Sequence, residues 1–261
     1  MIKVLIIGKK SFIGSNLYLS LKKKFIVRLI SFSKFKKKKE NFFKKFTHII
    51  NCSVNPKYVK LKYNKKFDND IIIAKKIKNF KIRYIFFSSR KVYYPKYNIK
   101  ETSIPKPTCN YSKNKIRTEK NLNLILKHKV LIFRISNIIG LPIKNNNRKV
   151  HWTFIDQFFY LAKKGTIIDN GNIFKDFISI NKFSEIIYFA IKKDISGIYN
   201  ISIGKKIYLN KIVEWLNYYN KNKCKIVKLK KNLSNKDNFT LNNEKLMKII
   251  SFKYSINDLE K

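Results

Sequence analysis

The sequence predicts an α/β fold: a doubly wound parallel sheet with a small C-terminal region. Short β-branched runs alternate along the chain with segments of helical periodicity, which is typical of parallel strands joined by crossover helices. The chain has 261 residues, 44% of them hydrophobic, which is enough for one large buried core. Glycine is scarce, yet two of the seven glycines, Gly8 and Gly14, bound the loop after the first predicted strand.

The N-terminal half supplies most of the predicted sheet. Continuous apolar runs indicate buried strands, and apolar residues spaced three to four apart indicate helices. The predicted strands are Lys3–Ile7, Phe25–Ser31, His48–Cys52, Arg83–Ser88 and Val130–Arg134. The predicted helices run from Phe12 to about Leu21, from a cap at Asp68 or Asn69 through Ile72, Ile73 and Ile77, and from Tyr111 to about Leu126.

The pattern becomes irregular from Lys144 onward. An aromatic-rich helix is expected near Thr153–Lys163, and a further helix begins at Asn210. Strands at Asp176–Ile180 and Gly197–Ile201 flank a helix that Asn181 can cap. The main domain is therefore assigned to residues 1–145 with a returning segment 176–203, and a smaller region to residues 146–175 and 204–261.

The net charge of +44 raises the possibility of nucleic-acid binding, because a basic surface attracts phosphate. Only six of the basic residues are Arg, the side chain suited to bidentate base recognition, and the lysines are spread over every element. We therefore expect a lysine-rich solvated surface with no specific nucleic-acid partner.

Cysteine and histidine spacings predict neither disulfides nor a metal site. Three cysteines (Cys52, Cys109, Cys224) and three histidines (His48, His128, His151) are scattered without ligand spacing. The N-terminal apolar run is too short for a membrane span and leads directly into a Gly turn, unlike a signal peptide. A cytoplasmic protein with reduced thiols and no membrane partner is expected.

The segment "VLIIGKKSFIGSNL" is the first motif along the chain that indicates a binding site. Gly8 ends a strand and a helix opens near Phe12–Gly14, so backbone amides and the positive helix end can bind a pyrophosphate. Ser11 stands where a further glycine is expected; its hydroxyl can hydrogen-bond a phosphate, but its side chain needs space.

Tyr111 and Lys115, in "CNYSKNKIRTEK", are one of six Tyr–Lys pairs spaced four apart, where chance alone supplies roughly three. Four of the other pairs lie in helical patterns, and Tyr58 lies in a predicted loop. Tyr111 alone follows a strand ending in Ser-Ser, Ser88 and Ser89, and it shares a helix face with Lys115. A nearby ammonium favours phenolate, so this tyrosine can exchange a proton with a sugar hydroxyl or carbonyl.

Taken in order, these motifs resemble the extended short-chain dehydrogenases/reductases that act on nucleotide sugars. "SSRKVYYP" is similar to the family's "SSxxVYG", and "ETSIPKPTCNYSKNK" to its "E…P…P…YxxSK". "INCSVNP", "FRISNIIG", "KDFISINKFSEII" and "GIYNISIG" also resemble family motifs, in the family's order and over nearly the whole chain. Two departures stand out: Tyr94 replaces the Gly after "VY", and the stretch between Ser31 and His48 is too short for a full strand–helix unit.

The resemblance implies a Rossmann-type domain that binds a dinucleotide and a small substrate-binding region. It implies catalysis by Ser89, Tyr111 and Lys115, and substrate contacts from Arg90, Asn137 and Lys175. The implied cofactor contacts are Gly8, Ser11, Phe12, Ile13, Gly14, Ser33, Lys34, Asn51, Cys52, Ser88, Tyr111 and Lys115. Homodimerisation through the helix bearing Tyr111 is a further family expectation.

The residues narrow the reaction without fixing it. Family dehydratases carry an acidic pair after the catalytic Ser/Thr, whereas Arg90 and Lys91 stand there. No acid follows the second strand, and Ser33 and Lys34 can accept a 2′-phosphate, which favours NADP over NAD and a reductase over an epimerase. An epimerase that recycles NAD, and a non-catalytic dinucleotide-binding protein of the same fold, remain alternatives.

Overall fold

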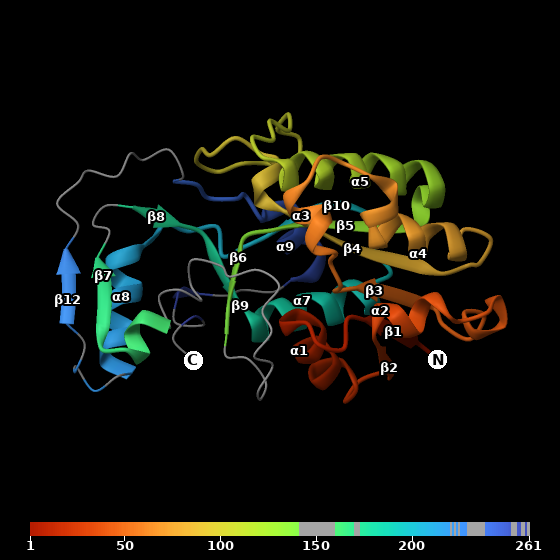
Figure 1. Ribbon diagram of the computed structural model, residues 1–261, viewed down its shortest axis with the longest axis horizontal. Coiled ribbons are helices and arrows are strands. Elements are labelled where there is room, and N and C mark those ends of the chain that lie inside the picture. Colours follow the sequence, from red (N-terminus) through yellow and green to blue (C-terminus); the bar gives the residue numbers. More distant parts are fainter. Residues whose placement is uncertain are drawn as a thin grey trace.

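The centre of the molecule is a six-stranded parallel sheet (Figure 1). The computed structural model describes residues 1–140, 160–169, 173–219, 221, 223, 225–228, 238–251, 255–256 and 259. The strand order is β10–β5–β4–β3–β1–β2, and each neighbouring pair is parallel. The strands are β1 (Lys3–Ile7), β2 (Ile26–Ile30), β3 (His48–Asn51), β4 (Arg83–Ser89), β5 (Val130–Ile135) and β10 (Gly197–Ile201). The predicted doubly wound α/β fold is confirmed.

Helices cover both faces of this sheet. α1 (Phe12–Leu21) and α7 (Ile180–Lys192) lie on one face, and α4 (Asn69–Ile77) and α5 (Asn110–Leu126) on the other (Figure 1). Side chains of β4 alternate between them: Ile85 and Phe87 belong to the α1–α7 core, and Tyr84 and Phe86 to the α4–α5 core. A strand buried on both faces reads as an unbroken apolar run, which is why the sequence pattern located these strands well.

The connection from β2 to β3 is short. It holds α2 (Phe32–Lys36) and the 3₁₀ turn η1 (Glu40–Phe42) but adds no strand beyond β2, so β2 forms the edge of the sheet. Phe35 and Phe43 from this connection are fully buried in the α4–α5 core. The segment therefore closes the end of the core with aromatic rings, as its length predicts, in place of a strand–helix unit.

Three local assignments needed correction. Ser179 caps α7, accepting a hydrogen bond from the Lys182 N–H at 3.3 Å; the prediction of Asn181 was wrong because the preceding strand β9 (Phe177–Ser179) ends at Ser179. β2 is shorter at both ends than the predicted Phe25–Ser31. Tyr58, assigned to a loop, lies on the short helix α3 (Pro56–Lys60). Asp68 caps α4, one of the two predicted residues.

A smaller group of elements lies beside the sheet, on the left in Figure 1. It comprises three strand pairs and a helix: β6 (Asn137–Ile139) with β9, β7 (Thr166–Asp169) with β12 (Lys225–Lys228), β8 (Phe174–Lys175) with β11 (Ile207–Tyr208), and α8 (Leu209–Tyr219). α9 (Glu244–Ile250) returns to the main sheet, where Leu246 and Ile250 join the α1–α7 core. The predicted division into two regions stays a prediction. α9 belongs by residue number to the predicted smaller region but packs on the larger one.

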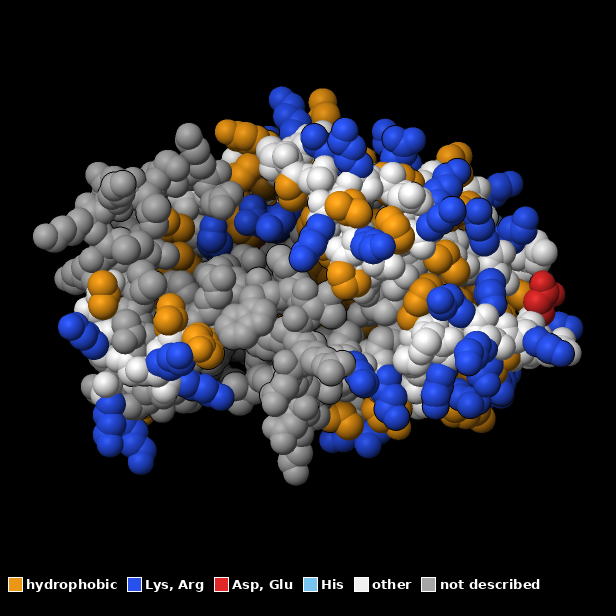
Figure 2. Space-filling view, viewed as in Figure 1, with side chains coloured by type: hydrophobic (Ala, Val, Ile, Leu, Met, Phe, Trp, Pro, Cys, Tyr) orange, Lys and Arg blue, Asp and Glu red, His pale blue; other side chains and the backbone are white. Residues whose placement is uncertain are grey.

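Part of the predicted helix Thr153–Lys163 lies outside the described residues, as do His151 and Cys224; residues 160–163 are helical. In the visible face of Figure 2, Lys and Arg side chains are spread over the sheet domain rather than gathered into one stripe. None of the helices within the described ranges combines the length and the apolar character that crossing a membrane requires.

Candidate active site

The loop between β1 and α1 needs glycine at both ends. Gly8 has φ +126°, and a Cβ there would lie 2.9 Å from the backbone carbon of Cys52. A Cβ on Gly14 would lie 2.6 Å from the Gly8 carbonyl oxygen. The loop is therefore packed too tightly for side chains at these positions, which brings backbone amides to the surface of the turn.

Ser11 caps α1 within this loop. Its Oγ accepts a hydrogen bond from the Gly14 N–H at 2.9 Å, so the serine side chain fits where a glycine is usual. The cap satisfies one of the amides that lack an intrahelical acceptor at a helix start. Phe12 and Ile13 lie in the same first turn, and their N–H groups stay directed out of the helix start, where an anion is stabilised.

The end of β2 lies beside this loop. The N–H groups of Gly8 and Lys9 donate to the Ile30 carbonyl at 2.8 and 3.2 Å. Ser33 and Lys34 follow on α2, and both are exposed. The structure thus brings these two predicted cofactor residues next to the glycine loop.

Asn51 and Cys52, at the end of β3, lie behind the loop. Cys52 packs against the positions where Gly8 and Gly14 lack a Cβ, and burial raises the pKa of its thiol well above the usual range. The Asn51 side chain is committed elsewhere: its Nδ2 donates to Asp70 at 2.8 Å, and its Oδ1 accepts from the Ser53 hydroxyl at 2.6 Å. Its amide therefore shapes the β3–α3 turn from within.

The two serines that end β4 have different surroundings. The Ser88 hydroxyl donates to Glu119, which forms a buried ion pair with Arg134 at 2.7 Å. Ser89 is half-buried, and its Oγ accepts from the Lys91 N–H at 3.2 Å. Ser88 is thus tied into the interior, whereas Ser89 lies at the strand's carboxyl end.

Tyr111 and Lys115 lie on the first turns of α5, which packs against β4 and the turn that follows Ser89. Tyr111 is half-buried, and the Lys115 Nζ lies 5.7 Å from the centre of its ring. The ammonium is buried and donates to the Phe87 carbonyl at 2.7 Å. Tyr111, Lys115 and Ser89 therefore lie at the same edge of the sheet as the glycine loop, as the carboxyl ends of parallel strands require.

The three predicted substrate residues lie around the segment that precedes α9. Arg90 is buried, and its guanidinium lies 4.0 Å from the centre of the Phe239 ring. Asn137 donates to the backbone carbonyl of Asp176 at 3.0 Å, and Lys175 is buried on β8. The carboxylate of Asp176 accepts from the Leu241 N–H at 2.9 Å, which ties this segment to β8 and β9.

Sequence reasoning named Asp68 only as a possible helix cap and did not single out Asp70. Asp68 and Asp70, in "FDND", are both buried at the start of α4. The signal was available: acids number only 15 in this chain, so two within three residues are notable. No group of three or more potential metal ligands forms within the described parts of the chain.

A model of the NAD-dependent epimerase/dehydratase family matches residues 4–202, more than half of the chain. The chain belongs to this family. Membership agrees with the resemblance found in the sequence and places this protein among enzymes that use NAD. No curated protein matches the sequence.

Solved structures of the same fold cover almost the whole chain. UDP-N-acetylglucosamine 4-epimerase from Methanobrevibacter ruminantium M1, in complex with UDP-N-acetylmuramic acid, is similar with a TM-score of 0.81 and 21% identity, over 99% of this chain and 94% of that one. UDP-glucose 4-epimerase from Thermotoga maritima, with UDP-glucose, has a TM-score of 0.78 and 15% identity, over 100% and 96%. dTDP-glucose 4,6-dehydratase from Bacillus anthracis, in complex with NAD, has a TM-score of 0.74 and 14% identity, over 100% and 94%.

Proposed function

We propose that this protein is an NAD(P)-dependent oxidoreductase that acts on a nucleotide-linked sugar and reduces a keto group by hydride transfer. One observation supports this most strongly: Tyr111 and Lys115 lie on the helix that packs against β4 and the turn after Ser89, at the sheet edge where the glycine loop opens. A proton donor, its neighbouring ammonium and a dinucleotide loop then converge on one place.

Each residue has a distinct task. The Tyr111 hydroxyl protonates the oxygen of the sugar carbonyl as that oxygen gains negative charge. Ser89 donates a second hydrogen bond to the same oxygen. The Lys115 ammonium stabilises the tyrosinate that remains and holds the ribose next to the nicotinamide.

The residues of the loop fit a dinucleotide. The close packing at Gly8 and Gly14 leaves a backbone surface without side chains, and the start of α1 offers its amides to a pyrophosphate. A bound nicotinamide supplies the hydride. Exposed Ser33 and Lys34 at the end of β2 can hold a 2′-phosphate, so we assign NADP as the preferred cofactor, with NAD as the alternative.

The same features favour a net reductase. No acid occurs in residues 31–39 to hold the ribose hydroxyls of NAD, which favours NADP, and a consumed NADPH suits a net reductase. The second candidate is an epimerase that retains NAD, which the description of the matching family favours. Arg90 and Lys91 after Ser89 disfavour dehydration, because neither can return a proton as a carboxylic acid does.

Arg90, Asn137 and Lys175 are assigned to the sugar or its diphosphate. The buried guanidinium of Arg90, stacked on Phe239, is rigid and suited to a phosphate oxygen. The homodimer through α5 and the absence of a specific nucleic-acid partner stay predictions.

The test begins with fluorescence titrations of NADPH and NADH in salt that screens the net charge of +44. Incubation with UDP- and dTDP-linked sugars and their 4-keto forms then distinguishes the outcomes. NADPH oxidation supports the reductase, and epimer formation without net oxidation supports the epimerase. Tyr111→Phe should abolish either reaction while sparing cofactor binding. Cofactor binding without either reaction indicates the non-catalytic alternative.

A further inference from the structure

One face of α5 carries a third polar residue in line with Tyr111 and Lys115. This residue is Glu119, and the spacing of four from each to the next puts all three along the same face of the helix. The contacts of the last two follow the end of β4: Lys115 donates to the Phe87 carbonyl at 2.7 Å, and Glu119 accepts from the Ser88 hydroxyl. The helix is therefore bound to the two residues that come directly before the predicted catalytic serine.

The Glu119 carboxylate is held by two neighbouring strands at once. Ser88 on β4 and Arg134 on β5 are opposite each other in the parallel register, so their side chains share the sheet face that α5 covers. Arg134 donates to Oε1 of Glu119 at 3.2 Å and to Oε2 at 2.7 Å, and the Ser88 hydroxyl also donates to Oε1. One buried carboxylate thus joins α5 to β4 and β5, and the bidentate pair fixes its angle as well as its distance.

Arg134 also holds the loop that follows Ser89. Its Nη1 donates to the Tyr93 hydroxyl at 2.8 Å and to the Glu101 carbonyl at 3.3 Å. Ser89 therefore lies between two residues that the same ion pair binds, Ser88 directly before it and Tyr93 after it.

A buried ion pair is weak evidence for stability, because desolvation of two charges offsets most of their attraction. Apolar side chains of similar volume often stabilise a fold as well or better. Apolar packing has no preferred direction, however, whereas a carboxylate between a hydroxyl and a guanidinium sets both distances and angles. The pair between Glu119 and Arg134 is therefore suited to fixing geometry.

We infer that Glu119 is a positioning residue: with Arg134 it binds Ser88, and so it sets the position of Ser89 relative to Tyr111. The inference rests on the proposed function of Ser89 and Tyr111. Glu119 acts through Ser88 and touches neither cofactor nor substrate. In this role the Ser88 hydroxyl links β4 to α5 and does not bind the cofactor.

The first experiment removes the link and keeps the ion pair. Turnover of UDP- and dTDP-linked sugars and their 4-keto forms is followed as NADPH oxidation or as epimer formation. In Ser88→Ala we expect kcat to fall about tenfold, the ratio that corresponds to one lost hydrogen bond. The KM of the sugar and the Kd of NADPH and NADH should stay at the wild-type values, because misplacement of Ser89 affects the transition state alone.

Ser184→Ala is the matched control. Ser184 on α7 is also a buried serine, and its hydroxyl donates to the Ile180 carbonyl at 2.8 Å on the other face of the sheet. Its replacement should leave kcat, KM and Kd unchanged.

The second experiment separates positioning from stability. Arg134→Met leaves the Glu119 carboxylate unpaired in the interior and should lower the urea midpoint, and the double variant Glu119→Met/Arg134→Met removes both charges and should restore much of it. In the double variant kcat per folded molecule should stay about tenfold or more below wild type, because Ser88 has no carboxylate to bind. A purely structural pair would regain its turnover together with its urea midpoint.

The outcomes separate the two proposals. Wild-type kcat in Ser88→Ala, a weaker cofactor Kd in that variant, or joint recovery of urea midpoint and kcat in the double variant would each overturn the role of Glu119 and leave the proposed function standing. A wild type that binds no cofactor or turns over none of these sugars overturns the proposed function, and the role of Glu119 falls with it.

Discussion

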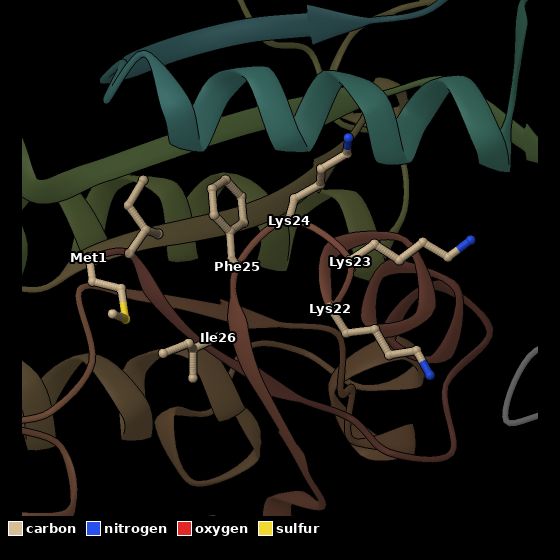
Figure 3. Close-up of a pocket in the computed structure, with 7 residues that line it drawn as sticks. Met1, Lys22, Lys23, Lys24, Phe25 and Ile26 are labelled. Atoms are coloured by element: carbon tan, nitrogen blue, oxygen red, sulfur yellow. The ribbon is translucent and has the colours of Figure 1, made fainter.

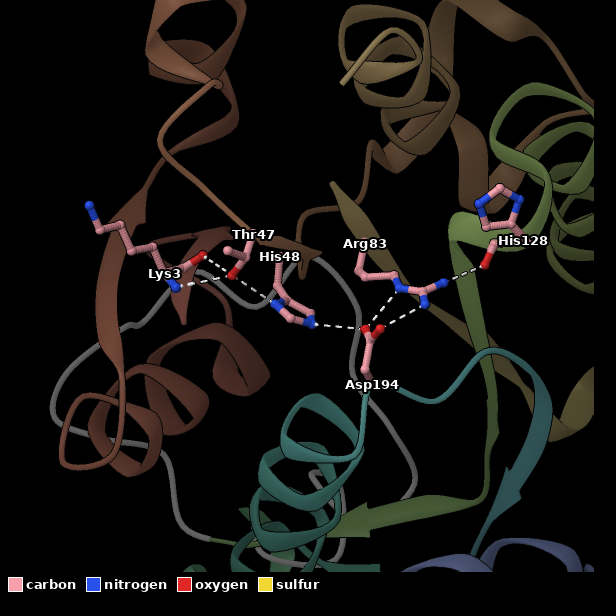
Figure 4. Close-up of polar contacts among 6 residues, drawn as sticks. All are labelled: Lys3, Thr47, His48, Arg83, His128 and Asp194. Carbon is pink, nitrogen blue, oxygen red and sulfur yellow. Dashed lines mark hydrogen bonds and ion pairs between the residues drawn. The ribbon is translucent and has the colours of Figure 1, made fainter. Parts of the chain in front are cut away.

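The two ends of the central sheet both hold buried titratable side chains, but only those at the carboxyl end lie at the edge that holds the glycine loop and Tyr111. At the amino end, His48 on β3 is 7% exposed; its Nδ1 contacts the Thr47 hydroxyl at 2.9 Å (Figure 4). Asp194, 3.8 Å from its Nε2, is already bound twice by Arg83, at 2.8 and 2.7 Å. Burial lowers the pKa of His48 to about 4, against the pull of Asp194 and with a contribution from Arg83. His48 is therefore uncharged at neutral pH, and the Asp194 carboxylate already accepts two hydrogen bonds from Arg83.

The amino end also has a hollow of about 380 Å³, lined by Met1, Ile2, Lys22, Lys23, Lys24, Phe25 and Ile26. Its lysine side chains fan out in different directions (Figure 3), so no common point receives their charge. At the carboxyl end, by contrast, helix starts and strand ends converge, and Lys115 is buried there with its charge. A hollow lined by cations is therefore no sign of a site unless the charges converge.

The largest expected effect is on kcat, and it is tested with one lysine from each end of the sheet. Lys115→Met should lower kcat by about 10²–10⁴-fold, because the tyrosinate loses its ammonium. The matched control is Lys129→Met at the amino end, where the Lys129 Nζ also donates to a backbone carbonyl, that of Lys78 at 2.6 Å. Steady-state kinetics on the accepted nucleotide sugar measures both. Equal losses in the two variants would contradict the assignment of function to the carboxyl end.

The next effect concerns stability at the carboxyl end. Arg134 and Glu119 form a buried pair, with exposed fractions of 5% and 3%, and Arg134 also donates to the Tyr93 hydroxyl at 2.8 Å. Arg134→Met leaves Glu119 charged and unpaired in the interior, so the free energy of unfolding should fall by about 3–5 kcal/mol. Urea denaturation at pH 7 measures this. A loss below about 1 kcal/mol, the value of an exposed pair, would show that water reaches the site.

A pH-dependent effect follows from His48. Its pKa is about 4 when folded, against about 6.5 for a free imidazole, so the unfolded chain binds more protons between these values. The contribution of His48 to stability is therefore complete above pH 6.5 and is lost as pH falls toward 4, by about 3 kcal/mol in all.

His48→Gln should remove this part of the acid sensitivity, measured as the difference from wild type in urea midpoints across pH. The difference is needed because burial raises the pKa of Asp70 to about 6 and that of Asp176 to about 7. These acids bind more protons when folded, so their effect has the opposite sign: it favours the fold at low pH and is lost as pH rises. An identical pH profile for the two proteins would mean that His48 stays solvated.

The smallest effect belongs to the exposed pair at the amino end. The Asp194 side chain is 55% exposed, so Asp194→Asn should change the free energy of unfolding by less than about 1 kcal/mol. Thermal unfolding at low and high salt measures the change, and turnover should be unaffected. A loss comparable to that of Arg134→Met would remove the contrast between the two ends.

The sequence by itself determined the sheet and the place of its chemistry. β1 was located to the residue, because a strand buried on both faces reads as a nearly continuous apolar run. The glycine loop and the Tyr111–Lys115 pair were found because sterics and helix spacing restrict the residues that can stand there. Motif order reinforced this, since the motifs follow one another along the chain as they do in the family that the sequence resembles.

The tertiary structure decided which polar side chains are free and which are committed. Ser88 and Asn51 stood in motifs as plausible cofactor contacts, yet their side chains bond to Glu119 and Asp70, residues distant in the sequence. Asp70 itself is buried because α4 packs on the sheet, where its carboxylate accepts hydrogen bonds from Asn51 on β3 and Tyr84 on β4. Hydrogen-bond partners and desolvation depend on contacts between separate elements, and no local pattern of residues specifies them.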